Sequence, residues 1–324
     1  MDSQVLCYVQ RKRITDWKRL VLTHDSPAFL YGSNDDRVFA SKLRKGSTLW
    51  VVSSIPGRNP ELVARLEVSV IVERDDPKLK VSPDLLRHFR EFKWIAKGTA
   101  NSRFFGYNDA GPALVRTVFE NSKGATWTFA ERGSQWRSEY GSRLQRPTLI
   151  QVSTESSGSH PSRDSTALEE LATSANRSVF ISWKWGDNPK ELALSLAYAL
   201  AKNNLMAWLD LLALPRARAL YQIQKDEVKL ERLLRYGYDQ CVCVLAIDSA
   251  NYGSQSVGSD RNWTLREWNG EVSPGKRLDR VCFNPRSLRQ SRLTSATDMS
   301  LRSATVDEAA SELAHWLQSK PQLA

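Results

Sequence analysis

The second half of the chain alternates short, continuously apolar runs with longer segments of helical periodicity. Strands joined by helices form βαβ units, which build a parallel sheet. Apolar runs without alternation are typical of strands that are covered on both faces. The pattern therefore predicts an α/β domain. Its expected strands are Val179–Ser182, Met206–Asp210, Cys241–Ile247 and Arg280–Phe283, and its expected helices are Pro189–Lys202, Asp226–Tyr236, one from about Trp263, and Val306–Gln318.

A serine-rich segment marks the expected domain boundary. Ser153–Ser165 contains six serines, one glycine and one proline, and no large apolar residue. Such a segment cannot bury a core and is typical of a flexible linker. The chain of 324 residues is also longer than most single domains. We therefore expect a domain over residues 1–152, a linker over 153–174 and the α/β domain over 175–324.

The first half has the pattern of a smaller α+β domain, for which a barrel is one possible form. Ser82 and Pro83 precede an amphipathic segment, as a cap and a first-turn proline do. Pro56 and Gly57 indicate a turn between two apolar runs. The expected strands are Thr48–Ile55, Glu61–Glu73 and Ala125–Glu131, and the expected helices are Asp84–Phe92 and Pro112–Glu120.

The positive charge of the chain is concentrated in its first half. Residues 1–148 hold 25 Lys and Arg against 16 Asp and Glu, whereas residues 149–324 hold 21 against 20. Such an asymmetry favours a polyanionic partner, such as nucleic acid, for the first half. A solvated basic surface without a partner has the same composition, so both interpretations stay open.

The sequence favours a cytoplasmic protein without a metal site. No apolar run is long enough to span a membrane, and the first residues lack the basic and apolar segments of a signal peptide. The four histidines are scattered and form no ligand pattern with the cysteines. The cysteines are Cys7, Cys241, Cys243 and Cys282, without Cys-x-x-Cys spacing.

The predicted topology places a candidate site before any family is considered. In a parallel α/β sheet, ligands bind beyond the carboxyl ends of the strands, where the strand order reverses. Residues Trp183 to Asp187 follow the first expected strand, and Asp210 closes the second. Residues Ser249 to Glu267 follow the third. These segments are the candidate ligand-binding region.

The order and spacing of the same segments are informative. Val179–Asp187 is a strand followed by an aromatic and basic loop, Trp208–Asp210 ends the second strand, and Ser249–Tyr252 precedes Trp263-Thr-Leu-Arg-Glu267. Together they resemble the TIR (Toll/interleukin-receptor) family in its opening strand and loop, its second strand, and its Trp-x-x-x-Glu stretch. The resemblance covers residues 177 to about 318. It implies a flavodoxin-like sheet with helices on both faces.

The resemblance also implies a catalytic residue. TIR domains are either signalling scaffolds or NAD-cleaving enzymes, and the enzymes use a glutamate in the helix after the third strand, which matches Glu267. Breaking the nicotinamide–ribose bond gives an oxocarbenium-like transition state, which a carboxylate can stabilise. Nicotinamide leaves as a neutral ring, so no general acid is needed. NAD⁺ is then a substrate and no cofactor is implied.

Several neighbouring residues would bind NAD⁺ in this frame. Trp263 lies four residues before Glu267, so the two share a helix face, and its ring could stack on a flat ligand. Lys184 could meet a phosphate oxygen. Each residue also has a structural interpretation, as a core tryptophan, a turn cap or an exposed helix glutamate. Glu271, one turn beyond Glu267, is interpreted as a surface residue. The NAD-binding candidates are Ser182, Trp183, Lys184, Trp185, Asp210 and Trp263.

One segment departs from the family pattern. Leu211–Ala219 contains no glycine, whereas many family BB loops contain one. The pose of the nucleotide there, and self-assembly through this loop, are therefore left open. Arg216 and Arg218 fit either phosphate contacts or a solvated basic loop.

The first half has a second, more limited resemblance. Gly46–Ser53 followed by Leu62–Val68 is similar to PUA-like and EVE-like small barrels, which read RNA or modified bases. Lys93-Trp94 and Arg103–Tyr107 place aromatic rings beside cations, as pockets for single strands or flipped bases do. Ordinary barrel core is the alternative for these residues.

The combination of parts resembles abortive-infection defence proteins. It implies an NAD⁺ glycohydrolase or ADP-ribose cyclase that forms a homo-oligomer when a nucleic acid or phage-derived trigger reaches its first domain. Two alternatives stay open at this point. One is a non-enzymatic TIR adaptor that acts by self-association, and the other is a TIR-related nucleoside deoxyribosyltransferase.

Overall fold

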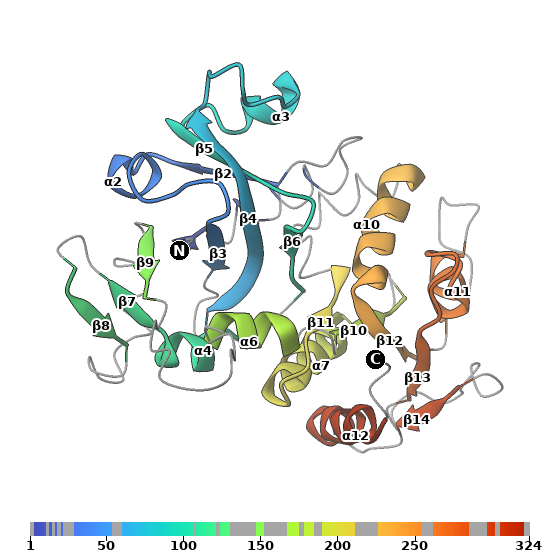
Figure 1. Cartoon of the computed structure of the whole chain (residues 1–324). Coiled ribbons are helices and arrows are strands. Elements are labelled where there is room, and N and C mark those ends of the chain that lie inside the picture. The colour runs from blue at the N-terminus through green and yellow to red at the C-terminus, as the bar shows by residue number, and fades with distance from the viewer. Residues whose placement is uncertain are drawn as a thin grey trace. The chain divides into compact units, whose positions relative to one another are not determined.

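Figure 1 shows the computed structural model of the chain, which divides into two compact units. The N-terminal unit comprises Met1–Phe105 and Asp109–Thr173, and the C-terminal unit comprises Gly106–Asn108 and Ser174–Ala324. The structure describes residues 3–10, 13–14, 17, 21, 29–53, 60–106, 108–120, 124–129, 147–151, 167–174, 178–184, 190–210, 226–249, 251–253, 262–284, 297–301 and 305–320.

The C-terminal unit is built on a sheet of five strands, all parallel, within the described residues. The order is β11-β10-β12-β13-β14. The first strand of this unit, β10, thus lies between β11 and β12, and the strand order reverses between β10 and β12. The first four strands are those expected, with β11 shorter, and β14 was not expected. The strands are β10 (Ser178–Ser182), β11 (Ala207–Trp208), β12 (Cys241–Ile247), β13 (Asp279–Phe283) and β14 (Met299–Leu301).

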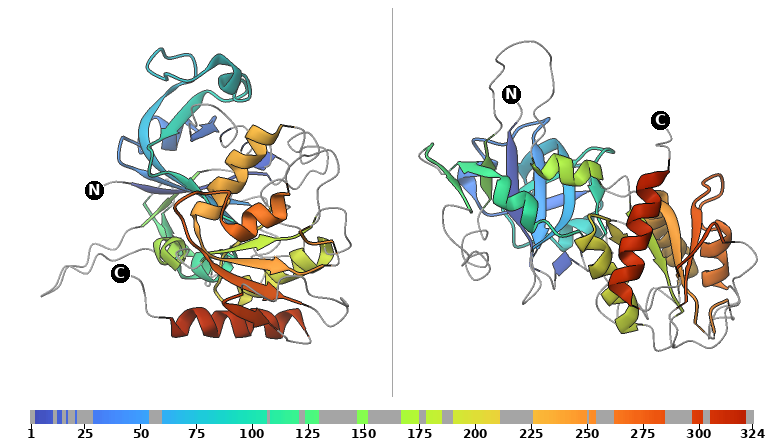
Figure 2. Two further views of the ribbon diagram at one scale, coloured as in Figure 1. Left: turned by 90° about the vertical axis from the view of Figure 1, so that its right-hand side faces the viewer. Right: turned by 90° about the horizontal axis from the view of Figure 1, so that it is seen from below.

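Helices cover both faces of this sheet. α7 and α12 pack against each other on one face, and α10 and α11 lie on the other (Figure 2). α12 begins at a capping box, in which Thr305 and Glu308 satisfy each other's backbone amides. All four helices of this unit were expected from the sequence, each within a few residues of its observed bounds. They are α7 (Lys190–Lys202), α10 (Glu227–Asp239), α11 (Trp263–Asn269) and α12 (Val306–Ser319).

The N-terminal unit contains a mixed, mostly antiparallel sheet. Its order is β2-β5-β4-β3-β1-β9-β7-β8, with β6 paired to β4, and β1 and β3 are its parallel pair. No pairing closes this order into a barrel within the described residues. The strands are β1 (Gln4–Tyr8), β2 (Leu30–Ser33), β3 (Thr48–Ser53), β4 (Glu61–Glu73), β5 (Trp94–Gly98), β6 (Arg103–Phe104), β7 (Val118–Glu120), β8 (Thr126–Thr128) and β9 (Thr148–Ile150).

Two helices of this unit are shorter than the sequence predicted. α3 (Pro83–Arg87) begins at the Ser82 cap as expected but ends well before Phe92, whose ring packs onto the backbone of Gly32 in β2. The expected helix Pro112–Glu120 was wrong in its last part. α4 ends at Arg116, and Val118–Glu120 form β7, because they pair with β8 and β9. The described helices are α2 (Asp36–Phe39), α3, α4 (Gly111–Arg116) and α6 (Ala167–Ser174).

Helix α6 corrects the expected linker. Its residues were assigned to the flexible segment 153–174, yet Leu168 and Ala172 are buried. Glu169 accepts a hydrogen bond from Gln4 at 2.9 Å, and Glu170 pairs with Arg116 at 3.0 Å. The helix is amphipathic and therefore packs its apolar face onto the N-terminal unit. The serine-rich part, Ser153–Ser165, lies outside the described residues.

None of the described helices is both long enough and apolar enough to cross a membrane.

Candidate functional site

The carboxyl ends of β10 and β12 meet where the strand order of the C-terminal sheet reverses. Trp183 and Lys184 follow β10, and Asp248 and Ser249 follow β12, and all four residues are buried. At such a switch point the connecting segments diverge to opposite faces, which leaves room for a ligand in doubly wound folds. These strand ends are therefore where the candidate site is built.

Helix α11 brings Glu267 to this edge. Asn262 caps the helix by accepting from the amide of Leu265 at 3.2 Å, and Gly270 ends it in the left-handed conformation at φ 78°. Trp263 and Glu267 lie one turn apart, and each is only 7% exposed. A carboxyl group that is buried this deeply costs free energy unless it has hydrogen-bond partners.

The partner of Glu267 comes from β10. The hydroxyl of Ser182 donates a hydrogen bond to Oε2 of Glu267, and it lies 2.7 Å from the hydroxyl of Tyr252. The hydroxyl of Tyr252 also lies 3.2 Å from the backbone carbonyl of Thr264, to which it can donate instead. All three side chains are buried. Strand β10, the turn after β12 and helix α11 thus meet in one chain of hydrogen bonds.

This chain can run in either direction. When Glu267 is ionised, Tyr252 donates to Ser182 and Ser182 donates to the carboxylate. When Glu267 is protonated, its hydroxyl donates to Ser182, which donates to Tyr252, which donates to the carbonyl of Thr264. Each hydroxyl has one proton to give and lone pairs to accept, so both protonation states of Glu267 keep hydrogen-bond partners.

Burial controls the titration of Glu267. Desolvation raises its pKa from 4.5 to about 8, the hydrogen bond from Ser182 opposes this, and the charge of Asp210 adds to the rise. Burial also raises the pKa of Tyr252 well above 10, so this phenol keeps its proton. Burial therefore favours the protonated form of Glu267, and a nearby positive charge, which lowers its pKa, favours the ionised form.

The turn that carries Tyr252 is tied to the start of α11. The amide of Gly253 donates to the hydroxyl of Thr264 at 3.1 Å, and the Asn262 side chain donates to the carbonyl of Gly253. The same asparagine caps the helix, so one side chain sets both the helix start and the position of the turn. These bonds hold Tyr252 against Ser182.

Trp183, Lys184 and Asp210 are found at the same edge. Trp183 donates its indole N–H to Oδ1 of Asp210 at 2.8 Å, which joins the ends of β10 and β11. Lys184 is buried at the end of β10. Trp185 lies outside the described residues, as do Leu211–Ala219. The structure thus brings Ser182, Trp183, Lys184 and Asp210 to one edge of the sheet.

Trp263 has a neighbour that limits its role. The guanidinium of Arg266 lies 4.8 Å from the centre of the Trp263 ring, and Arg266 pairs with Glu231 at 3.1 Å. The cation covers one face of the indole. Stacking on a ligand is thereby restricted to the remaining ring surface.

Glu271 lies beyond the end of α11 rather than on its next turn, because the helix stops at Asn269. Its carboxylate is 55% exposed and lies 3.8 Å from Arg266. The residue is on the surface, as the sequence indicated. It provides a matched control for substitutions of Glu267.

Sequence reasoning gave no role to two buried side chains of this edge. Tyr252 belonged to the segment that carried the family resemblance, and a buried tyrosine generally has a partner for its hydroxyl, which was the available signal. Asp248 follows β12, is fully buried, and accepts a hydrogen bond from Asn284 at 3.4 Å. The sequence feature that could have identified Asp248 is its position directly after the continuous apolar run of β12.

The residues singled out in the first half do not form one pocket. Lys93 and Trp94 both contact Asp36, at 2.7 and 2.6 Å. Arg103 lies over the ring of Phe105, which is buried in the core, and donates to a carbonyl of α6. Tyr107 lies outside the described residues. The core interpretation fits Arg103 and Phe105 better than a ligand pocket does.

Metal ligands are not gathered anywhere in the described part of the chain. No group of three or more His, Cys, Asp or Glu side chains there is placed to hold an ion. All four cysteines are buried and none forms a disulfide.

No model of a known protein family matches this chain, and no curated protein shows a significant sequence match to it.

Proposed function

We propose that the C-terminal unit is a flavodoxin-like TIR domain that cleaves NAD⁺ between nicotinamide and ribose, with Glu267 as the catalytic carboxylate. One observation carries the proposal. Glu267 is buried beyond the carboxyl ends of the strands, at the point where the strand order reverses, and accepts a hydrogen bond from Ser182 of β10. The order β11-β10-β12-β13-β14 is the flavodoxin-like order.

The reaction requires that the protein place a negative charge beside the ribose of the substrate. The bond between the nicotinamide nitrogen and C1′ of the ribose breaks, and its electron pair neutralises the positive ring. The ribose then carries positive charge at C1′ and its ring oxygen until water, or an atom of the adenine ring, adds to C1′ and loses a proton. A carboxylate beside the ribose stabilises this cation in a site that excludes water.

The raised pKa of Glu267 fits a cationic substrate. Nicotinamide brings a positive charge, which favours the ionised carboxyl and lowers its pKa. Ser182 and Tyr252 then donate along the chain toward the carboxylate, and this holds the ionised form in place. Glu267 thus gains its charge when the substrate is bound.

The remaining parts of the proposal rest on the resemblance and on charge. The basic N-terminal unit would act as the sensor for a nucleic acid or phage-derived trigger, and the protein would work in the cytoplasm as a homo-oligomer. Assembly would activate cleavage, so activity should rise more steeply than in proportion to protein concentration.

The test is turnover by the full-length protein. The protein, at several concentrations and with or without single-stranded nucleic acid, is incubated with NAD⁺, and released nicotinamide is measured. Catalytic release of nicotinamide supports the proposal. A protein that exchanges bases on deoxyribonucleosides but spares NAD⁺ would be a deoxyribosyltransferase. One that assembles yet leaves both substrates intact would be an adaptor.

A further inference from the structure

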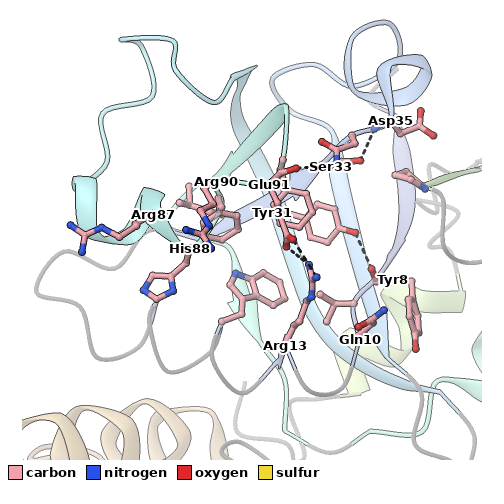
Figure 3. A pocket seen from close by; sticks show the side chains of 18 residues that line it. Tyr8, Gln10, Arg13, Tyr31, Ser33, Asp35, Arg87, His88, Arg90 and Glu91 are labelled. Carbon is pink, nitrogen blue, oxygen red and sulfur yellow. Dashed lines mark hydrogen bonds and ion pairs between the residues drawn. The ribbon is translucent and has the colours of Figure 1, made fainter.

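The N-terminal unit contains a pocket of about 1210 Å³, formed by described residues of that unit alone. Its lining comes from the end of β1, from β2, and from the segment that follows α3 (Figure 3). Arg87 and His88 lie on one side, Tyr8 and Gln10 lie on the other, and Arg13 and Tyr31 lie between them. Pockets that hold small organic ligands reach roughly 300–1,000 Å³, so this pocket has room for more than one nucleotide.

Aromatic rings make up much of the lining. Trp17 and Tyr31 lie edge to face with their centres 6.3 Å apart, and Phe89 and Phe92 lie 6.2 Å apart. The hydroxyl of Tyr31 donates to the carbonyl of Tyr8 at 3.0 Å, which fixes this ring. Flat rings held in place favour a flat partner, because stacking needs no specific hydrogen bonds.

A glycine maintains the shape of the pocket. A Cβ atom on Gly32 would lie 2.3 Å from the ring of Phe92, so only glycine lets this ring lie on β2. The amide of Asn34 donates to the carbonyl of Glu91 and accepts from the amide of Lys93, which ties the end of β2 to the same segment. The pocket wall is thus held in place by the fold.

Cations border the aromatic lining. Arg13 is paired with Glu91, and Arg87 with Asp84 at 3.0 Å on the surface, where an ion pair contributes little. The side chains of His88 and Arg90 are exposed and make no hydrogen bond or ion pair within the part of the chain that the structure describes. Arg87, His88 and Arg90 are therefore able to meet an anion at the edge of the pocket.

One hydrogen-bond donor among the lining residues is buried and unpaired within the described part of the chain. Trp17 lines the pocket and is 7% exposed, and its indole N–H has no acceptor among the described residues. A buried donor without an acceptor costs free energy. The nitrogen itself is inaccessible, however, so it gives the pocket no hydrogen-bond site for a ligand.

We propose that this pocket binds an unpaired nucleotide of a single-stranded nucleic acid, with the base among Trp17, Tyr31 and Phe92 and the backbone phosphates at Arg87 and Arg90. A strand is favoured over an acidic peptide because the lining combines flat rings with cations. The nine surplus positive charges of residues 1–148 also favour a polyanion. The proposal specifies the trigger that the proposed function assigns to the N-terminal unit, and it does not depend on NAD⁺ cleavage by the C-terminal unit.

The experiment measures binding by the full chain to labelled oligonucleotides through fluorescence anisotropy at several salt concentrations. Single-stranded DNA and RNA, a blunt duplex, a mononucleotide and poly-glutamate are compared. The variant Arg87→Gln/Arg90→Gln removes two exposed charges of the pocket. The variant Lys42→Gln/Lys45→Gln removes two exposed charges of the same unit outside the lining.

We expect the Arg87/Arg90 variant to bind single strands at least tenfold more weakly at low salt. The slope of the logarithm of the binding constant against the logarithm of the salt concentration should become shallower by about 1.4, since each phosphate contact on a single strand contributes about 0.7. The lysine variant should bind like the wild type. Equal losses in both variants, or none in either, would overturn the assignment of the pocket.

A second measurement tests the base. With 2-aminopurine in the strand, binding should quench its fluorescence by stacking, and Phe92→Leu, which keeps the apolar contact, should reduce the quenching. Unchanged quenching in this variant would contradict a stacked base. Stronger binding to the duplex, to poly-glutamate or to the free mononucleotide would overturn the choice of a single strand. Binding of a strand and release of nicotinamide are measured separately, and the NAD⁺ assay is also run without nucleic acid, so failure of one proposal is distinguishable from failure of the other.

Discussion

The hydroxyl of Ser182 donates a hydrogen bond to the carboxyl group of Glu267, a residue 85 positions further along the chain. The bond joins the end of the central strand β10 to the helix α11, and the hydroxyl of Tyr252 joins it from the turn after β12. Substitutions of Glu267 and Ser182 should therefore change catalytic activity, the pKa of Glu267 and the stability of the protein, and each effect can be measured separately.

Replacing Glu267 with glutamine should abolish most NAD⁺ cleavage. The change keeps the volume and removes the charge, and the loss of one electrostatic contact in the transition state typically lowers the rate about 100- to 1,000-fold. Nicotinamide release is the measurement, under conditions in which the wild type turns over. Glu271→Gln is the control, because this carboxylate is 55% exposed. A Glu267→Gln protein that matches the wild-type rate would remove the catalytic assignment.

The wild-type protein should lose stability relative to Glu267→Gln as the pH rises from about 4.5 to 8. The folded state raises the pKa of Glu267 to about 8, so in this window it binds a proton that the unfolded chain has released. Stability then falls with rising pH, by at most about 1.4 kcal/mol per pH unit. Below this window both states are protonated, and above it both are ionised.

Urea unfolding of the two proteins at a series of pH values checks this, because their difference isolates the one group. A difference that is constant across the window would mean that Glu267 is not desolvated in the folded protein.

Removing the hydroxyl of Ser182 should shift the pH profile of catalysis. The hydrogen bond from Ser182 lowers the pKa of Glu267, so Ser182→Ala should raise it further. In the wild type, kcat/KM should rise with pH up to about 8, and in the variant this rise should move to higher pH. Ser300→Ala, at an exposed position of β14, is the matched control. A lower rate with an unmoved profile would assign Ser182 to packing alone.

Truncating Leu168 should destabilise the protein. The side chain is completely buried on α6, and Leu→Ala changes in a core cost about 2–5 kcal/mol. Truncation of Val228, whose side chain is 61% exposed, should cost little. Thermal unfolding of Leu168→Ala and Val228→Ala in the full chain compares the two. Equal transition temperatures of the two variants would mean that α6 is not packed on the N-terminal unit and belongs to the linker, as the sequence first predicted.

Local pattern was enough to predict most of the C-terminal unit. Helices α7, α10 and α12 were expected close to their observed bounds, because their helical apolar periodicity continues over several turns. Strand β12 was expected because it is a continuous apolar run of seven residues. The spacing of four residues also predicts that Trp263 and Glu267 share a helix face, and both lie on α11.

The predictions that were wrong concern residues whose structure depends on tertiary contacts. Val118–Glu120 continue a helical pattern but pair as β7 with two strands, since hydrogen bonds from a sheet outweigh a short helical preference. Leu168 and Ala172 follow a serine-rich run that resembles a linker, but they have an apolar surface to pack on.

The sequence by itself determined which side chains end the parallel strands, because apolar runs and the βαβ rule specify where each strand stops. It could not determine that Glu267 is buried or that its pKa rises to about 8. Nor could it show that Ser182 and Tyr252 share a hydrogen bond. Only the tertiary structure decided these properties, because desolvation and hydrogen bonding depend on groups that lie far apart in the chain and close together in space.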